Sequence, residues 1–142
     1  MEQRKTLDSW SGHVFKLGRS PMVLFMHDAS LWHILIPAKG ITTLEKLLPL
    51  FLARVRQVWS DHGVEFDDKN LSLGFLPRSD RSLIGSMNDA IHQIRCYAEM
   101  GLKIDDPTGL AEIEDRLHKT PYSSLGYGFP DRKLNELLSR QG

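Results

Sequence analysis

Five residues able to bind or position another molecule recur at helical spacing in the middle of the chain. Positions three or four residues apart share one face of an α-helix, and this stripe consists of Arg81, Gly85, Asn88, His92 and Arg95. A guanidinium binds a carboxylate or phosphate in a two-pronged fashion. An amide can orient the bound group, and an imidazole can transfer a proton near neutral pH. We expect the stripe to bind a ligand or partner, with Asp28 added from a strand end.

The alternative for the same stripe is a solvated helix face, which is the usual state of polar residues on a surface helix. Gly85 costs about 1 kcal/mol relative to alanine inside a helix, so we expect something to approach its backbone closely. Ser82, Ser86 and Asp89 lie on another side of the helix, where they would cap it, tie it to a neighbour or meet solvent. We do not expect a single pocket to be lined both by residues of the stripe and by residues of this second polar group.

The helix that carries the stripe is predicted from its apolar positions. Ser79 or Asp80 is a suitable N-cap, and the helix should end near Met100, before Gly101. One side is apolar and must face the core; it contains Leu83, Ile84, Met87, Ala90, Ile91, Ile94 and Ala98.

Four strands are predicted from alternation and from short apolar runs. The run at residues 22–26 is apolar at every position, which is typical of a strand covered on both faces. A two-residue loop at Asp28-Ala29 would place Phe25 opposite Trp32. The strands are expected at residues 12–17, 22–26, 31–36 and 71–75.

Three further helices are predicted around the sheet. Thr42 and Glu45 form a capping-box pair before a strongly periodic segment that ends at Gly63, and Pro49 should kink or break it. Asp106-Pro107 and Asp131 begin the other two. The fold class is therefore α+β: a small antiparallel sheet of about four strands, beginning with a β-meander, with helices packed mainly on one face. We expect a single domain over residues 1–142.

Composition restricts the possible functions. The 142 residues contain 18 basic and 18 acidic side chains, so the net charge is zero. That balance disfavours extended nucleic-acid binding. A single cysteine, Cys96, fits a reducing compartment. No N-terminal signal sequence or membrane-length apolar run is visible, and a cytoplasmic location is expected.

Motifs for cofactors and metals are missing from the sequence. There is no P-loop and no G-x-G-x-x-G, so no cofactor is expected. His13, His27 and His33 could cluster on neighbouring strands, but cysteine or carboxylate ligands at metal-site spacing are lacking, so no metal is expected. Tyr122, Tyr127 and Phe129 could stack on a partner; we expect them instead to seal the core under a glycine-rich loop.

Three segments resemble a domain-of-unknown-function family of bacteria, phages and mobile elements. The string Arg81-Ser-Leu-Ile-Gly-Ser-Met-Asn-Asp89 is similar to its signature. Trp10, Val14-Phe15, Val23-Leu24-Phe25, Asp28 and Leu35-Ile36-Pro37 resemble its N-terminal half, and Leu117, Thr120-Pro121, Leu125, Tyr127-Gly128 and Pro130 its C-terminal half. The chain departs from the pattern with His13 and His27 where the family suggests asparagine, so a role for those amides does not transfer.

These observations lead to three hypotheses. The first is a non-enzymatic binding or regulatory module, with a protein partner or a small anionic ligand, in a phage or mobile-element system (defence, counter-defence or toxin–antitoxin). The second is a small enzyme acting on a phosphate- or nucleotide-containing substrate, with Arg81 holding the anion and His92 or Asp89 as acid–base. In the third, the signature residues serve only the fold.

Overall fold

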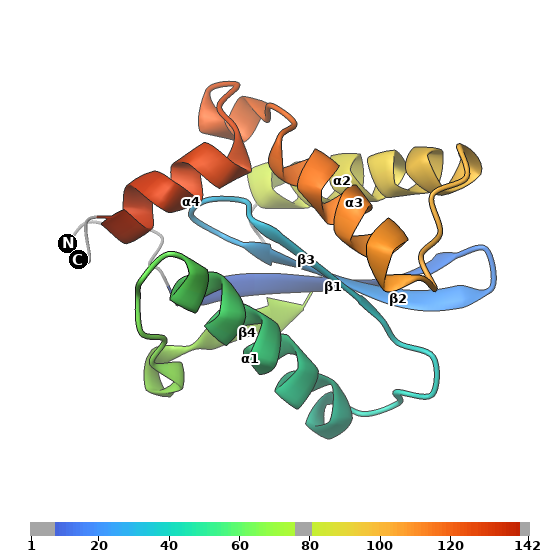
Figure 1. Cartoon of the computed structure of the whole chain (residues 1–142), viewed down its shortest axis with the longest axis horizontal. Helices are drawn as coiled ribbons and strands as arrows, with labels where there is room; N and C mark the ends of the chain where they lie inside the picture. Colours follow the sequence, from blue (N-terminus) through green and yellow to red (C-terminus); the bar gives the residue numbers. More distant parts are fainter. Residues whose placement is uncertain (1–7, 76–80, 140–142) are drawn as a thin grey trace.

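A four-stranded sheet in the order β3-β2-β1-β4 forms the centre of the computed structural model, which describes residues 8–75 and 81–139 (Figure 1). β1 (Ser9–Leu17), β2 (Ser20–His27) and β3 (His33–Pro37) form an antiparallel meander. β4 (Ser72–Phe75) pairs parallel to β1. The α+β class and the initial meander are confirmed, but the sheet is mixed rather than wholly antiparallel. The chain leaves β3 at one edge, passes through α1 and returns at the opposite edge, where β4 runs in the direction of β1.

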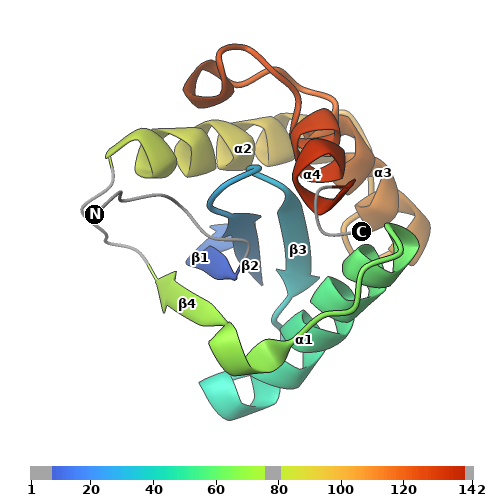
Figure 2. The same ribbon diagram turned by 90° about the vertical axis from the view of Figure 1, so that its left-hand side faces the viewer.

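Helices cover both faces of the sheet, so the expectation that they pack mainly on one face is wrong. α1 (Leu44–Asp61) lies against one face and α2 (Arg81–Glu99) against the other (Figure 2). In β2, Leu24 contributes to the core under α2, and its neighbours Val23 and Phe25 contribute to the core under α1. An uninterrupted apolar strand needs cover on both sides, and two separate cores result.

The remaining helices complete these two layers. α3 (Pro107–His118) and a 3₁₀ turn, η2 (Ser123–Leu125), pack with α2, and α4 (Pro130–Ser139) joins the core under α1. A second 3₁₀ turn, η1 (Asp68–Asn70), precedes β4.

Five residues, 28–32, separate β2 from β3, where a two-residue loop was expected. His27 donates its backbone N–H to the Trp32 carbonyl at 2.8 Å, and Leu31 donates to the His27 carbonyl at 2.7 Å. Phe25 therefore pairs with Ile34 rather than with Trp32. The register differs from the expected one by two residues, and an even shift leaves every side chain on its predicted face.

The start of α1 differs by one residue from the predicted one, and its internal proline does not break it. Thr43, not Thr42, caps α1 by accepting from the Lys46 N–H at 3.3 Å, and α1 continues through Pro49 without a break. The N–H that Pro49 lacks would have bonded the carbonyl four residues earlier. That carbonyl belongs to Glu45, which is exposed, so solvent can satisfy it.

Of the other two predicted helix starts, that of α3 is confirmed and that of α4 is not. Asp106 caps α3, with Pro107 at the first helical position, as predicted. Asp131 is not a cap: α4 already begins at Pro130. The caps expected at Ser79 or Asp80 lie outside the described residues.

The exposed edge of β3 is closed by two side chains of α3. Glu114 accepts the Leu35 N–H at 2.7 Å through Oε2. One turn later, Nε2 of His118 lies 2.8 Å from the His33 carbonyl oxygen and 3.2 Å from the His33 backbone nitrogen. In the tautomer protonated at Nε2, His118 donates to that carbonyl. The i, i+4 spacing on one helix therefore supplies an acceptor and a donor where a further strand would otherwise bind. Glu114 also forms an ion pair with Arg54 of α1, so one carboxylate joins α1, α3 and β3.

Gly85 and Gly109 provide a matched test of glycine packing. Gly85→Ala is expected to raise the free energy of unfolding by about 1 kcal/mol, because alanine is the better helix former. A Cβ there would meet no described atom within 4 Å. Gly109→Ala is expected to lower it, because its Cβ would collide with the Lys103 backbone. Urea denaturation measures both changes, and a destabilised Gly85→Ala would contradict the open surroundings.

Acid is expected to destabilise the fold through His33 and His118. Burial lowers the pKa of His118 from 6.5 to about 4. Burial, and secondly the charge of His118, lower the pKa of His33 well below 6.5. Between pH 6.5 and about 4 the unfolded chain binds protons that the folded protein does not. Each histidine should then remove up to about 1.4 kcal/mol of stability per pH unit.

Chemical denaturation between neutral and mildly acidic pH measures this slope. Glu114 partly offsets this loss of stability in acid. Burial raises the pKa of its carboxyl group, so the folded protein protonates Glu114 more readily than the unfolded chain does. His118→Gln is the control: its amide can donate to the His33 carbonyl but does not titrate. This variant should show a flatter pH dependence, and an unchanged slope would exclude His118 as a source.

Candidate functional site

All five residues of the predicted stripe lie on the exposed side of α2. Arg81, Asn88 and His92 are exposed, and Gly85 has open space above it. At the far end, the Arg95 guanidinium donates to the Lys16 carbonyl at 3.3 Å. The stripe is therefore a continuous solvent-facing surface, held at one end to β1.

Asp28 is separated from this surface. It is 6% exposed and lies in the β2–β3 loop, where Oδ1 accepts a hydrogen bond of 2.7 Å from the Ser11 hydroxyl. Its backbone N–H donates to the Ser9 carbonyl at 3.0 Å. Asp28 thus ties the hairpin loop to β1, and no residue of the stripe is among the residues lining the pocket beside it.

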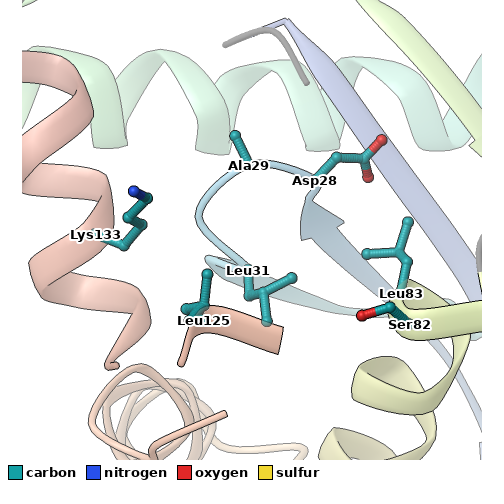
Figure 3. A pocket seen from close by; sticks show the side chains of 7 residues that line it. All are labelled: Asp28, Ala29, Leu31, Ser82, Leu83, Leu125 and Lys133. Carbon is teal, nitrogen blue, oxygen red and sulfur yellow. The ribbon is translucent and has the colours of Figure 1, made fainter. Parts of the chain in front are cut away.

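The pocket beside Asp28 has a volume of about 340 Å³ (Figure 3). The Asp28 carboxylate turns away from the Lys133 ammonium on the other side of the pocket. Ser82 brings a hydroxyl from the first turn of α2, and Nζ of Lys133 lies 3.9 Å from Oε1 of Glu136. The remaining wall is formed by Ala29, Leu31, Leu83 and Leu125. One ammonium and one hydroxyl can hold a small anion only weakly at such an open site.

A second pocket, of about 320 Å³, lies between α2 and the loop around η2. It combines His92 from the stripe with Asp89 from the other polar group, so the expectation that one pocket would not use both groups is wrong. The i, i+3 spacing places the two side chains on adjoining parts of the helix surface. The lining residues are Asp89, His92, Gln93, Pro121, Tyr122, Ser123 and Tyr127.

The aromatic residues of this loop have different roles. Tyr122 is 3% exposed, and its hydroxyl lies 3.3 Å from Nε2 of His33. Burial raises the pKa of this phenol, and a hydrogen bond with Gln93 lowers it by less. Tyr127, in contrast, is 72% exposed and has a backbone φ of +63°. Tyr122 seals the core as predicted, and Tyr127 does not.

The histidines of the sheet do not form a cluster. His27 contacts Trp10 and Trp59 on the α1 side, and His33 contacts Tyr122 and His118 on the other side. Within residues 8–75 and 81–139, no three histidine, cysteine or acidic side chains are close enough to hold a metal ion. In the same ranges no helix has the length and hydropathy needed to cross a bilayer.

A protein-family model matches residues 1–133. The chain belongs to this family, described as "Domain of unknown function (DUF6933)". The family match includes the sheet, α2 and the loop around η2, and therefore all residues that line the two pockets described above. No curated protein matches the chain.

The Ser11–Asp28 hydrogen bond is expected to support the fold of this DUF6933 domain. Ser11→Ala removes a donor from a buried carboxylate, which should lower the free energy of unfolding by about 1–3 kcal/mol. Ser20→Ala, at an exposed position of the same sheet, is the control and should change it by less than about 0.5 kcal/mol. Thermal and urea denaturation measure both. Equal stability of the two variants would show that Asp28 does not depend on Ser11.

Proposed function

We propose that this protein is a non-enzymatic binding module whose partner is a protein bound along the exposed face of α2. The observation that carries the proposal is Gly85. It lies inside α2, where glycine costs about 1 kcal/mol, yet no described atom lies within 4 Å of the position that its Cβ would occupy. The internal packing of the described residues therefore does not require the glycine. Close approach by a partner's backbone would require it.

The surroundings of Gly85 suit recognition. Arg81 is one turn earlier and Asn88 is almost one turn later, and both are exposed. Among the described residues, no hydrogen bond or ion pair is found for either side chain, so both remain available to a partner. A guanidinium and an amide next to a bare stretch of helix can bind carboxylates and backbone groups of an approaching chain.

The enzyme alternative has less support. It needs Arg81, Asn88 and His92 to converge with a strand-end group such as Asp28. Asp28 is instead buried and bonded to Ser11, and the three helix residues face solvent. The phage or mobile-element setting and the cytoplasmic location also belong to the proposal, and they rest on the sequence resemblance and on Cys96.

Affinity capture from lysate of the source organism tests the proposal. The wild type should retain a specific protein, and Arg81→Ala/Asn88→Ala should lose it without a change in thermal stability, because both residues are exposed. Lys46→Ala, an exposed cation on α1, is the control and should retain it. Absence of a specific partner, or equal capture by the double variant, would contradict the proposal.

A second variant tests the role of Gly85 directly. Gly85→Gln puts a long polar side chain of good helix propensity onto the surface. It should leave the protein at least as stable as the wild type and reduce capture. Full capture by this variant would show that no chain approaches α2 closely at this point.

A further inference from the structure

We infer that the pocket between α2 and the η2 loop binds a cationic side chain, arginine or lysine, of the protein partner. The inference rests on the proposed function, because it assigns a partner chemistry to the surface that includes His92. Two residues carry it: Tyr127, which is held outward by a strained backbone, and Asp89, which supplies the negative charge of the pocket.

The conformation of Tyr127 is costly. A non-glycine residue in the left-handed region is strained, and a bulky aromatic ring gains little when it is 72% exposed. The turn is nevertheless fixed: the Tyr127 N–H donates to the Tyr122 carbonyl at 2.9 Å, and the Tyr122 N–H donates to the Gly128 carbonyl at 3.1 Å. Glycine would suit this φ of +63° better. The exposed Tyr127 ring is therefore available for contact with a binding partner.

The charge of the pocket identifies the ligand class. Among the residues that line it, Asp89 brings the one carboxylate, and none is a lysine or arginine. The Asp89 charge is felt inside the pocket, because it adds to the raised pKa of Tyr122 after the larger effect of burial. A negative charge here would repel the phosphate of a nucleotide and attract a guanidinium or ammonium.

An aromatic face beside a carboxylate is a favourable environment for a cation. The ring attracts the cation through its quadrupole, and the carboxylate accepts charge-assisted hydrogen bonds. The Gln93 carboxamide oxygen lies 3.1 Å from the Thr120 hydroxyl, and its two lone pairs leave it able to accept from a cation as well. The volume of about 320 Å³ has room for the end of one long side chain.

Titration with N-acetyl-arginine amide, followed by ¹H–¹⁵N NMR, tests the inference on the isolated protein. Saturable shifts at the amides of Asp89, His92 and Tyr127 are expected, with millimolar affinity that weakens with salt. The neutral isostere N-acetyl-citrulline amide should bind at least about tenfold more weakly. Equal binding of the two compounds, or no localised shift with the arginine compound, would overturn the inference.

Variants assign the effect to the two residues. Asp89→Asn should weaken arginine binding at least about tenfold, and Glu99→Gln, an exposed acid on the same helix, should leave it unchanged. Tyr127→Phe should bind normally. Tyr127→Gly should bind more weakly but melt at no lower temperature, because it relieves the left-handed strain. Wild-type affinity in Asp89→Asn or Tyr127→Gly would overturn the inference.

Partner capture separates this inference from the proposed function. If Arg81→Ala/Asn88→Ala loses the partner and Asp89→Asn retains it, the α2 surface stands and the cation pocket fails. If the double variant retains the partner, the α2 surface fails, whatever the arginine titration shows. Loss of the partner in both variants supports the two together.

Discussion

The closed edge of β3 is the interaction on which the arrangement of this protein depends. Glu114 and His118 of α3 bind the backbone of Leu35 and His33 at an edge that would otherwise expose unpaired groups. This attachment fixes α3 relative to the sheet. The loop that follows α3 is then held by Tyr122 against His33. The position of Tyr127 beside α2 therefore depends on hydrogen bonds made at the β3 edge of the sheet.

The polar groups of the protein divide by role according to burial. Glu114, His118 and Asp28 are almost fully buried, and each has a hydrogen-bond partner that joins two elements. A buried polar group without such partners would destabilise the fold. On the outer face of α2, Arg95 bonds the Lys16 carbonyl of β1. For Arg81, Asn88 and His92 no such bond to another element is found among the described residues, and we assign recognition to them rather than to the buried carboxylates.

Much of the fold could be predicted from local sequence patterns, whereas the residues of the candidate site could be predicted only in part. The spacing of Arg81, Gly85 and His92 correctly indicated one exposed helix face, because helical periodicity is local. The position of Asp28 at a strand end favours grouping it with these residues, but its carboxylate accepts from Ser11, which is 17 positions away in the sequence. The glycine-rich loop predicts that Tyr122 and Tyr127 both seal the core, and no local signal separates them. In the structure Tyr127 is 72% exposed, in a turn where its backbone φ is +63°.

The sequence by itself determined the meander, the helices and the side of α2 that faces the core, because these follow from periodicity, capping residues and turn residues over short ranges. It also contained the reason for a two-sided sheet, in the unbroken apolar run of β2. Only the tertiary structure decided that β4 joins parallel to β1 and that Asp89 and Tyr127 share one pocket. Both results depend on contacts between segments far apart in the chain, and the free energy of such contacts is not written in local residue patterns.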